Sequence, residues 1–122
     1  MNVVLLTGRL TRNPEVRYTS ETQMAIANFS IAVKRHGKKD ETDFPRCKAF
    51  GKTAEAMEKY CRKGSMIGIE GRIQTGTYEK DGKTVYFTEV IADKVEFINT
   101  GEKDQQEQKQ DGYMAINEDV PF

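Results

Sequence analysis

The chain has 122 residues, 31% of them charged, and a formal net charge of zero. This length suits one compact domain and leaves room for a short tail. The charge is spread unevenly: residues 1–99 hold 17 lysines and arginines against 13 acids, a net of +4, whereas residues 100–122 hold 2 against 6, a net of −4. A basic body joined to an acidic tail is typical of chains that bind nucleic acid or regulate that binding.

Cysteine and histidine usage excludes several classes of site. The two cysteines, Cys47 and Cys61, do not make a disulfide framework or a zinc site, and the single His36 argues against a histidine-rich metal centre. The opening residues MNVVLLTGRL carry no basic leader, and their apolar run is too short for a signal peptide or a membrane span. We therefore expect a cytoplasmic protein with free thiols and no cofactor.

The first half of the chain reads as three strands. Aliphatic and β-branched runs predict strands over residues 2–11 and 24–34, and Asn13-Pro14 breaks the first of them. One side of the second strand carries Ala25, Ala27, Phe29, Ile31 and Val33. A charged loop over residues 35–43 separates it from a third predicted strand over residues 44–50.

A helix, a strand and a hairpin are predicted next. Thr53 suits the N-cap of a helix that runs to about Lys63, and Gly64 suits a left-handed stop. Its apolar stripe is Ala54, Met57, Tyr60 and Cys61. A fourth strand is expected over residues 66–75, with one face made of Ile67, Ile69 and Ile73. The dipeptide Asp81-Gly82 predicts the turn of a hairpin that leads into a fifth strand through residue 97.

This order of elements, three strands, one helix and two strands, predicts an all-β fold with one helix. It is the order of an OB-fold, a five-stranded Greek-key barrel whose middle strands and hairpin loops commonly bind oligonucleotides. We expect the barrel to occupy residues 1–99. Residues 100–122, low in hydrophobics and rich in glutamine and acids, are expected to form a disordered tail that ends in the sequence EDVPF.

The third predicted strand has an inverted pattern. With a two-residue period, its small residues share one side, and its large aromatics and cations share the other: Phe44, Arg46, Lys48 and Phe50. Aromatic rings stack on the bases of an unpaired strand, at about 1–3 kcal/mol per base. Lysine and arginine neutralise its phosphates. The pattern therefore predicts an exposed face that binds single-stranded nucleic acid.

Other residues extend this prediction. Tyr78 and Tyr86 flank the Asp81-Gly82 turn and are candidates to extend the aromatic platform. The candidate cations are those beside the turn, those of the charged loop and two within strands: Lys80, Lys83, Lys34, Arg35, Lys38, Lys39, Arg9 and Arg72.

Several alternatives stay open. The opposite register of the third strand would bury Phe44 and Phe50, and the charged loop is also explained as a solvated turn balanced by its own acids. Tyr86 and Phe87 occupy opposite faces of the hairpin, and the pattern does not say which face is buried. A divalent-ion site at Asp40, Glu41 and Asp43, or a nucleophile pair of Cys47 with His36, is less favoured, because nothing around these residues supports either chemistry.

Four segments resemble one known family, the bacterial-type single-stranded DNA-binding proteins. They are VVLLTGRLTRNPEVRYT at the start, FGKTAEAMEKYCRKGSMIGIEGRIQT in the middle, TEV at residues 88–90 and EDVPF at the end. The resemblance implies an OB-fold, a homotetramer, and binding of single-stranded DNA with little sequence preference. It also implies no cofactor and no catalytic activity.

The resemblance also assigns roles to particular positions. The stacking aromatics of the family fall on Phe44, Phe50 and Tyr78, and a further one aligns near His36. The chain departs from the family in having no tryptophan, which often fills such places. The tip resembles the family's acidic C-terminal peptide, which docks onto replication, recombination and repair proteins; the matching residues are Glu118, Asp119, Val120, Pro121 and Phe122.

The sequence thus predicts sequence-nonspecific binding and protection of single-stranded DNA, with partner recruitment through the tip. The main alternative is an OB-fold adaptor that mostly contacts proteins and binds little DNA. An RNA-binding OB protein and a nuclease on the same barrel are the other rivals.

Overall fold

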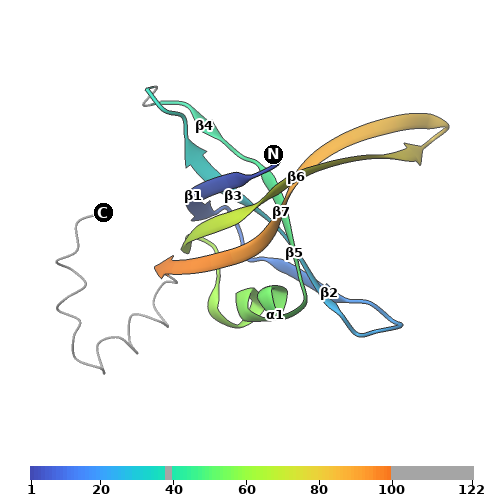
Figure 1. Ribbon diagram of the computed structural model, residues 1–122, viewed down its shortest axis with the longest axis horizontal. Helices are drawn as coiled ribbons and strands as arrows, with labels where there is room; N and C mark the ends of the chain where they lie inside the picture. Colours follow the sequence, from blue (N-terminus) through green and yellow to red (C-terminus); the bar gives the residue numbers. More distant parts are fainter. Residues whose placement is uncertain (38–39, 100–122) are drawn as a thin grey trace.

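The computed structural model describes residues 1–37 and 40–99. Its strands and single helix, seen in Figure 1, are β1 (Val4–Leu10), β2 (Glu15–Tyr18), β3 (Ala25–Lys34), β4 (Thr42–Asp43), β5 (Arg46–Phe50), α1 (Gly51–Tyr60), β6 (Met66–Lys80) and β7 (Lys83–Asn99).

The sheet closes on itself. Its strand order is β1-β6-β7-β5-β3-β2, and an additional pairing of β1 with β3 completes a ring of five strands. All pairs are antiparallel except β5 with β7, which is parallel. This closed ring with one helix between its third and fourth strands is the predicted OB-fold.

Two short strands were not predicted. β2 pairs with β3 outside the ring, so the chain returns to the sheet directly after the break at Asn13-Pro14. β4 lies in the predicted charged loop and pairs with the end of β3, whereas the third predicted strand, residues 44–50, is shortened because β5 begins only at Arg46. Pro45 explains the gap, because proline has no N–H to donate to a ladder.

The helix begins earlier and ends earlier than predicted. Its N-cap is Phe50, with no side-chain hydrogen bond, so Thr53 is not the cap. Gly51 has a φ of +62°, which lets the chain turn from β5 straight into α1. The helix ends at Tyr60, and Gly64, although its φ is +90°, belongs to the turn that enters β6.

The core lies inside the ring and under α1. Its buried side chains include the alternating inward residues of β3 and the two inward residues of β5, which are Ala25, Ala27, Phe29, Ile31, Cys47 and Ala49. Ala54 and Met57 of α1 and Ile67 and Ile69 of β6 close this core. The small residues of β5 are therefore the side that packs, as the inverted pattern predicts.

Two predicted core residues are exposed. Ile73 is 46% exposed because β6 has left the barrel at that point, and Tyr60 is 45% exposed at the end of α1. The pairing of β6 with β7 shifts register between Glu70 and Gly71. A Cβ added at Gly71 would lie 1.9 Å from the Ile91 carbonyl oxygen, so only glycine fits this close approach.

Some predictions fall outside the described part of the chain. These are the disordered tail of residues 100–122, the EDVPF tip, and Lys38 and Lys39. Within residues 1–37 and 40–99, no helix is long and apolar enough to cross a membrane.

Candidate nucleic-acid interface

We use the name platform for the outward residues of β5 together with Phe44, which precedes β5 and is separated from it by Pro45. It consists of Phe44, Arg46, Lys48 and Phe50. Phe44 is 62% exposed and Phe50 39%, whereas Cys47 and Ala49 are buried. The predicted register is therefore confirmed, and the opposite register, which buries both rings, is wrong. Large apolar rings held in solvent beside cations need a ligand or a partner to explain them.

The neighbouring strands add polar groups to the platform. Asn28 of β3 pairs with Lys48, and Ser30 pairs with Arg46. On the far side of β3, Glu15 of β2 pairs in turn with Asn28. Directly paired residues share a face, so these side chains lie beside the platform. Sequence reasoning missed them, although the alternation that placed Ala27 and Phe29 inside already placed Asn28 outside.

A two-stranded arm projects from the barrel. We define it as residues 74–89, the outer parts of β6 and β7, which Figure 1 draws as a long hairpin reaching away from the other strands. Asp81 and Gly82 have φ values of +53° and +76°, both positive as a type I′ turn requires, so the predicted turn is confirmed.

The arm has two unlike faces. Tyr78 pairs with Val85 and Gly76 with Phe87, and the rings of Tyr78 and Phe87 lie 6.2 Å apart, so they share one side, the Phe87 face. Tyr86 pairs with Thr77 and is 72% exposed on the other side, the Tyr86 face. The prediction that Tyr78 and Tyr86 extend one platform is therefore wrong, because their positions alternate across the two faces.

Phe87 is the aromatic that sequence reasoning did not select. A Cβ added at Gly76 would lie 2.4 Å from Cζ of the Phe87 ring, so the ring lies directly over the glycine. The signal for it was the cross-strand register that the Asp81-Gly82 turn imposes, which sets Phe87 opposite Gly76. Lys80 and Lys83 pair at the end of the same ladder and, by alternation, lie on the side of Tyr78.

One ion pair joins the platform to the Phe87 face. Nζ of Lys48 lies 3.4 Å from Oε1 of Glu89, and their side chains are only 29% and 15% exposed. Glu89 pairs with Gln74 on the same side of the ladder as Phe87. The outward face of β5 therefore continues along the arm through Glu89.

The charged loop holds one of its cations tightly. Nη1 of Arg35 lies 2.7 Å from Oε1 of Glu41, and the same guanidinium binds the Asp43 carboxylate. Its hydrogen bond lowers the pKa of Asp43. Arg35 is thus engaged within the loop, as the solvated-turn alternative requires for this residue. Lys34 and His36 are exposed beside it.

Two other predicted cations are bound to groups of the protein itself. Nη1 of Arg9 donates to the Gly64 carbonyl at 2.9 Å, and Nη1 of Arg72 pairs with Oδ1 of Asp93 at 2.6 Å. Arg9 lies on β1 across from Met66, a different part of the barrel surface. Arg72, by contrast, pairs with Ile91, which also pairs with Lys48, so Arg72 lies on the same outward face as Lys48, two strands away.

Neither catalytic alternative finds support in the geometry. Burial raises the pKa of the Cys47 thiol to about 12, which keeps it protonated, and His36 lies in the exposed loop. Both cysteines are free and buried. Within residues 1–37 and 40–99, no group of three or more metal-ligating side chains comes together, and the acids at 41 and 43 bind Arg35 instead.

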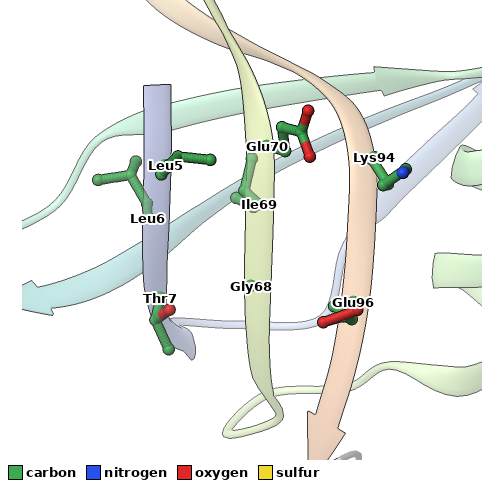
Figure 2. A pocket seen from close by; sticks show the side chains of 8 residues that line it. All are labelled: Leu5, Leu6, Thr7, Gly68, Ile69, Glu70, Lys94 and Glu96. Carbon is green, nitrogen blue, oxygen red and sulfur yellow. The ribbon is translucent and has the colours of Figure 1, made fainter. Parts of the chain in front are cut away.

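A second surface lies over β1, β6 and β7. Figure 2 shows a shallow cavity there, lined by Leu5 and Thr7 of β1, Gly68 and Glu70 of β6, and Lys94 and Glu96 of β7 among others. We call this the Leu5 face. Leu5 is 71% exposed at its edge. Gly68 leaves a flat place in it, since an added Cβ would meet nothing closer than 3.7 Å.

Comparisons with known proteins agree with this geometry. The model of the single-strand binding protein family matches residues 1–98. The chain is 50% identical over 106 residues to the single-stranded DNA-binding protein of Oceanobacillus iheyensis, covering 82% of this chain and 65% of the relative. It is 46% identical over 102 residues to that of Clostridium perfringens, covering 83% and 68%. Against single-stranded DNA-binding protein B of Bacillus subtilis it is 47% identical over 103 residues, covering 80% and 90%.

The family match spans every described strand and the helix, and the relatives share close to half of their aligned residues with this chain. The chain belongs to the single-strand binding protein family.

Proposed function

We propose that this protein binds and protects single-stranded DNA with little sequence preference. The observation that carries the proposal is the platform: two exposed rings flank two cations along β5 and the residues just before it, and this face continues onto the Phe87 face of the arm. Stacking aromatics with interleaved cations suit a strand whose bases are unpaired and whose phosphates are close by. The relatives are named single-stranded DNA-binding proteins.

The proposed contacts divide by chemistry. Base stacking falls to Phe44, Phe50, Tyr78 and Phe87, and phosphate contacts fall to Arg46, Lys48, Lys80, Lys83 and Lys34. His36, Arg72 and Arg9 are assigned lesser roles, because Arg72 and Arg9 are already bound to Asp93 and Gly64. Tyr86 faces the other side of the arm and is reached only by a strand that wraps around it.

Fluorescence anisotropy tests this proposal directly. Labelled oligo-dT is titrated with the full chain at several salt concentrations, beside duplex DNA of the same length and oligo-U. Tight, salt-sensitive binding to oligo-dT with much weaker binding to duplex is expected. Failure to bind oligo-dT at low salt overturns it in favour of the adaptor. A preference for oligo-U points to an RNA-binding protein, and divalent-ion-dependent shortening of the strand points to a nuclease.

A binding role without a catalytic step is proposed, in the cytoplasm. A thiol whose pKa lies near 12 is a poor nucleophile at neutral pH, which argues against Cys47 chemistry. Free buried cysteines suit a reducing compartment. The proposal divides the chain into a DNA-binding domain over residues 1–99 and a tail over residues 100–122.

The tail is proposed to recruit proteins of DNA replication, recombination and repair. Phe122 offers a ring, and Glu118 and Asp119 would speed its encounter with a basic-rimmed apolar pocket. Removal of residues 113–122 is expected to abolish capture of such partners while the barrel still binds oligo-dT. Retention of partner capture by the truncated chain would contradict this assignment.

A homotetramer is proposed, with the Leu5 face as one contact surface. Its exposed leucine and the flat place at Gly68 suit a second protein surface better than water. Leu5→Lys is expected to lower the assembled mass in analytical ultracentrifugation. Gly68→Gln tests the same face, because its Cβ has room within the subunit. Unchanged mass in both variants would place the contact elsewhere.

A further inference from the structure

A cavity lies over β2, β3 and β5 beside the platform, and Glu89 of the arm reaches its lining. Its volume is about 380 Å³, within the range of small-ligand sites. Its polar lining comes from four strands and the turn before β2: Arg12, Glu15, Asn28, Ser30, Arg46 and Glu89. We call it the Glu89 cavity. It lies on the same outward side as the stacking rings, because Arg46 belongs to the platform and Glu89 to the Phe87 face.

Phosphate binding alone does not account for this lining. A phosphate site needs cations and N–H donors, and Arg12 and Arg46 provide these. Glu15 and Glu89, however, place two carboxylates in the same cavity, and like charges repel a phosphate. A ligand that suits this mixture has to carry hydrogen-bond donors as well as acceptors and no charge of its own.

The Glu89 carboxylate is held in place and keeps acceptor capacity. Its Oε1 faces Nζ of Lys48 at 3.4 Å, and its side chain is 15% exposed. Among residues 1–37 and 40–99, Lys48 is its one ion-pair or hydrogen-bond partner. An ionised carboxylate accepts about four hydrogen bonds, so most of its lone pairs point to ligand or water.

We propose that the Glu89 cavity receives an unstacked nucleobase that bears an exocyclic amino group, and that the Glu89 carboxylate accepts a hydrogen bond from this group. The inference rests on the proposed binding of single-stranded DNA and deepens it. It adds a modest base preference to an interface that otherwise reads no sequence.

Cytosine matches the cavity best. Its edge presents an amino donor beside a ring-nitrogen and a carbonyl acceptor, and a carboxylate is the usual protein partner of its N4 amino group. Arg46 and Asn28 supply donors for its two acceptors. Thymine has carbonyl oxygens on both sides of its one N–H, so one of them would face the Glu89 carboxylate with no proton between.

The test compares oligo-dC with oligo-dT at one length of about eight nucleotides, which suits a single OB-fold. Full-length wild type and Glu89→Met are titrated at the same salt concentration. Methionine keeps the length of the side chain and removes both acceptors. Removal of a negative charge from a DNA-binding face alone would tighten binding of both strands. We therefore expect dT affinity to stay or rise, and dC affinity to fall about fivefold relative to dT.

Three further variants separate the effect of the Glu89 carboxylate on base preference from general effects of charge. Lys48→Met keeps the acceptor and is expected to weaken dC and dT in parallel. Glu79→Met removes an acid from the Tyr86 face, where it pairs with Thr84, and leaves the dC-to-dT ratio unchanged. Glu89→Gln, which keeps one acceptor oxygen, is expected to give an intermediate ratio. Circular dichroism melting confirms that each variant is folded.

The outcomes separate this inference from the proposed function. If Glu89→Met binds dT but its dC-to-dT ratio equals that of wild type, the base-accepting role is overturned, and Glu89 serves only to hold Lys48. If wild type binds neither strand, the proposed function falls and the inference falls with it.

Discussion

The two faces of the arm carry the same residue type with different surroundings. Tyr78 lies against Phe87, on the side that Glu89 connects to the platform through Lys48. Tyr86 lies eight positions away on the opposite side, among threonines 75, 77, 84 and 88. Tyr86 is the more exposed ring, 72% against 50% for Tyr78, so exposure by itself does not identify the binding ring. We propose Tyr78 as the binding ring because its face continues the cationic surface of the barrel.

Arg46 and Arg35 also share a residue type and differ in their surroundings. Arg46 lies on the platform with no ion pair in the part of the chain that the structure describes, so its charge is available to a ligand. Arg35 is bound to Glu41 and Asp43. Its charge is already neutralised, and its ion pair with Asp43 helps to fix β4, which directly precedes Phe44. Four experiments test these contrasts.

The largest change in oligo-dT affinity is expected from substitution of the tyrosines. Tyr78→Ala should weaken oligo-dT binding by about 1–3 kcal/mol, because one stacking ring is lost. Tyr86→Ala should leave affinity nearly unchanged. Anisotropy titration of both variants at one salt concentration measures the difference. Equal losses would show that DNA contacts both faces of the arm.

A smaller loss of oligo-dT affinity is expected from Gly76→Ala. The new Cβ would lie 2.4 Å from Phe87 Cζ, so the Phe87 ring has to move, which changes its contact with Tyr78. Oligo-dT binding should weaken by about 0.5–1.5 kcal/mol, the usual worth of an aromatic pair, while the melting temperature changes little because the arm lies outside the core. Thr77→Ala, on the other face, is the matched control. Full affinity in Gly76→Ala would mean that the ring pair is not needed.

The arginines are expected to differ in salt dependence. Arg46→Gln should reduce the slope of log K against log salt by about 0.7, the value for one phosphate contact on a single strand. Arg35→Gln should leave the slope unchanged, because that charge is already paired. Titrations at four or more salt concentrations give both slopes. A reduced slope in Arg35→Gln would return this residue to the set of phosphate contacts.

The smallest expected effect is the pH dependence of folding stability that the Arg35–Asp43 pair causes. The Arg35 hydrogen bond lowers the pKa of Asp43 in the folded protein, so the pair stabilises the fold above the usual carboxyl pKa of 3.8 and is lost as pH falls through the lower folded value. Because both side chains are exposed, the stability change should be slight. NMR titration of the Asp43 carboxyl carbon should give a higher midpoint in Arg35→Gln than in wild type. Identical midpoints would argue against the ion pair in solution.

Much of the barrel could be predicted from local pattern. The alternation over β3 and β5, the Asp81-Gly82 turn and the place of α1 between β5 and β6 all follow from residues within one element or its ends. The predictions of element boundaries that were wrong also have physical causes. Pro45 interrupts a ladder that the alternation treats as continuous, and the left-handed Gly51 starts the helix before Thr53 can cap it.

The sequence by itself determined which side chains of each strand point together, because a period of two needs no knowledge of the partner strand. It therefore predicted the platform of Phe44, Arg46, Lys48 and Phe50 in full. Only the tertiary structure decided how such faces join. The parallel pairing of β5 with β7 brings Glu89 to Lys48, and so selects Tyr78 and Phe87 over Tyr86. Partners this far apart in sequence are set by sheet closure, which no local pattern encodes.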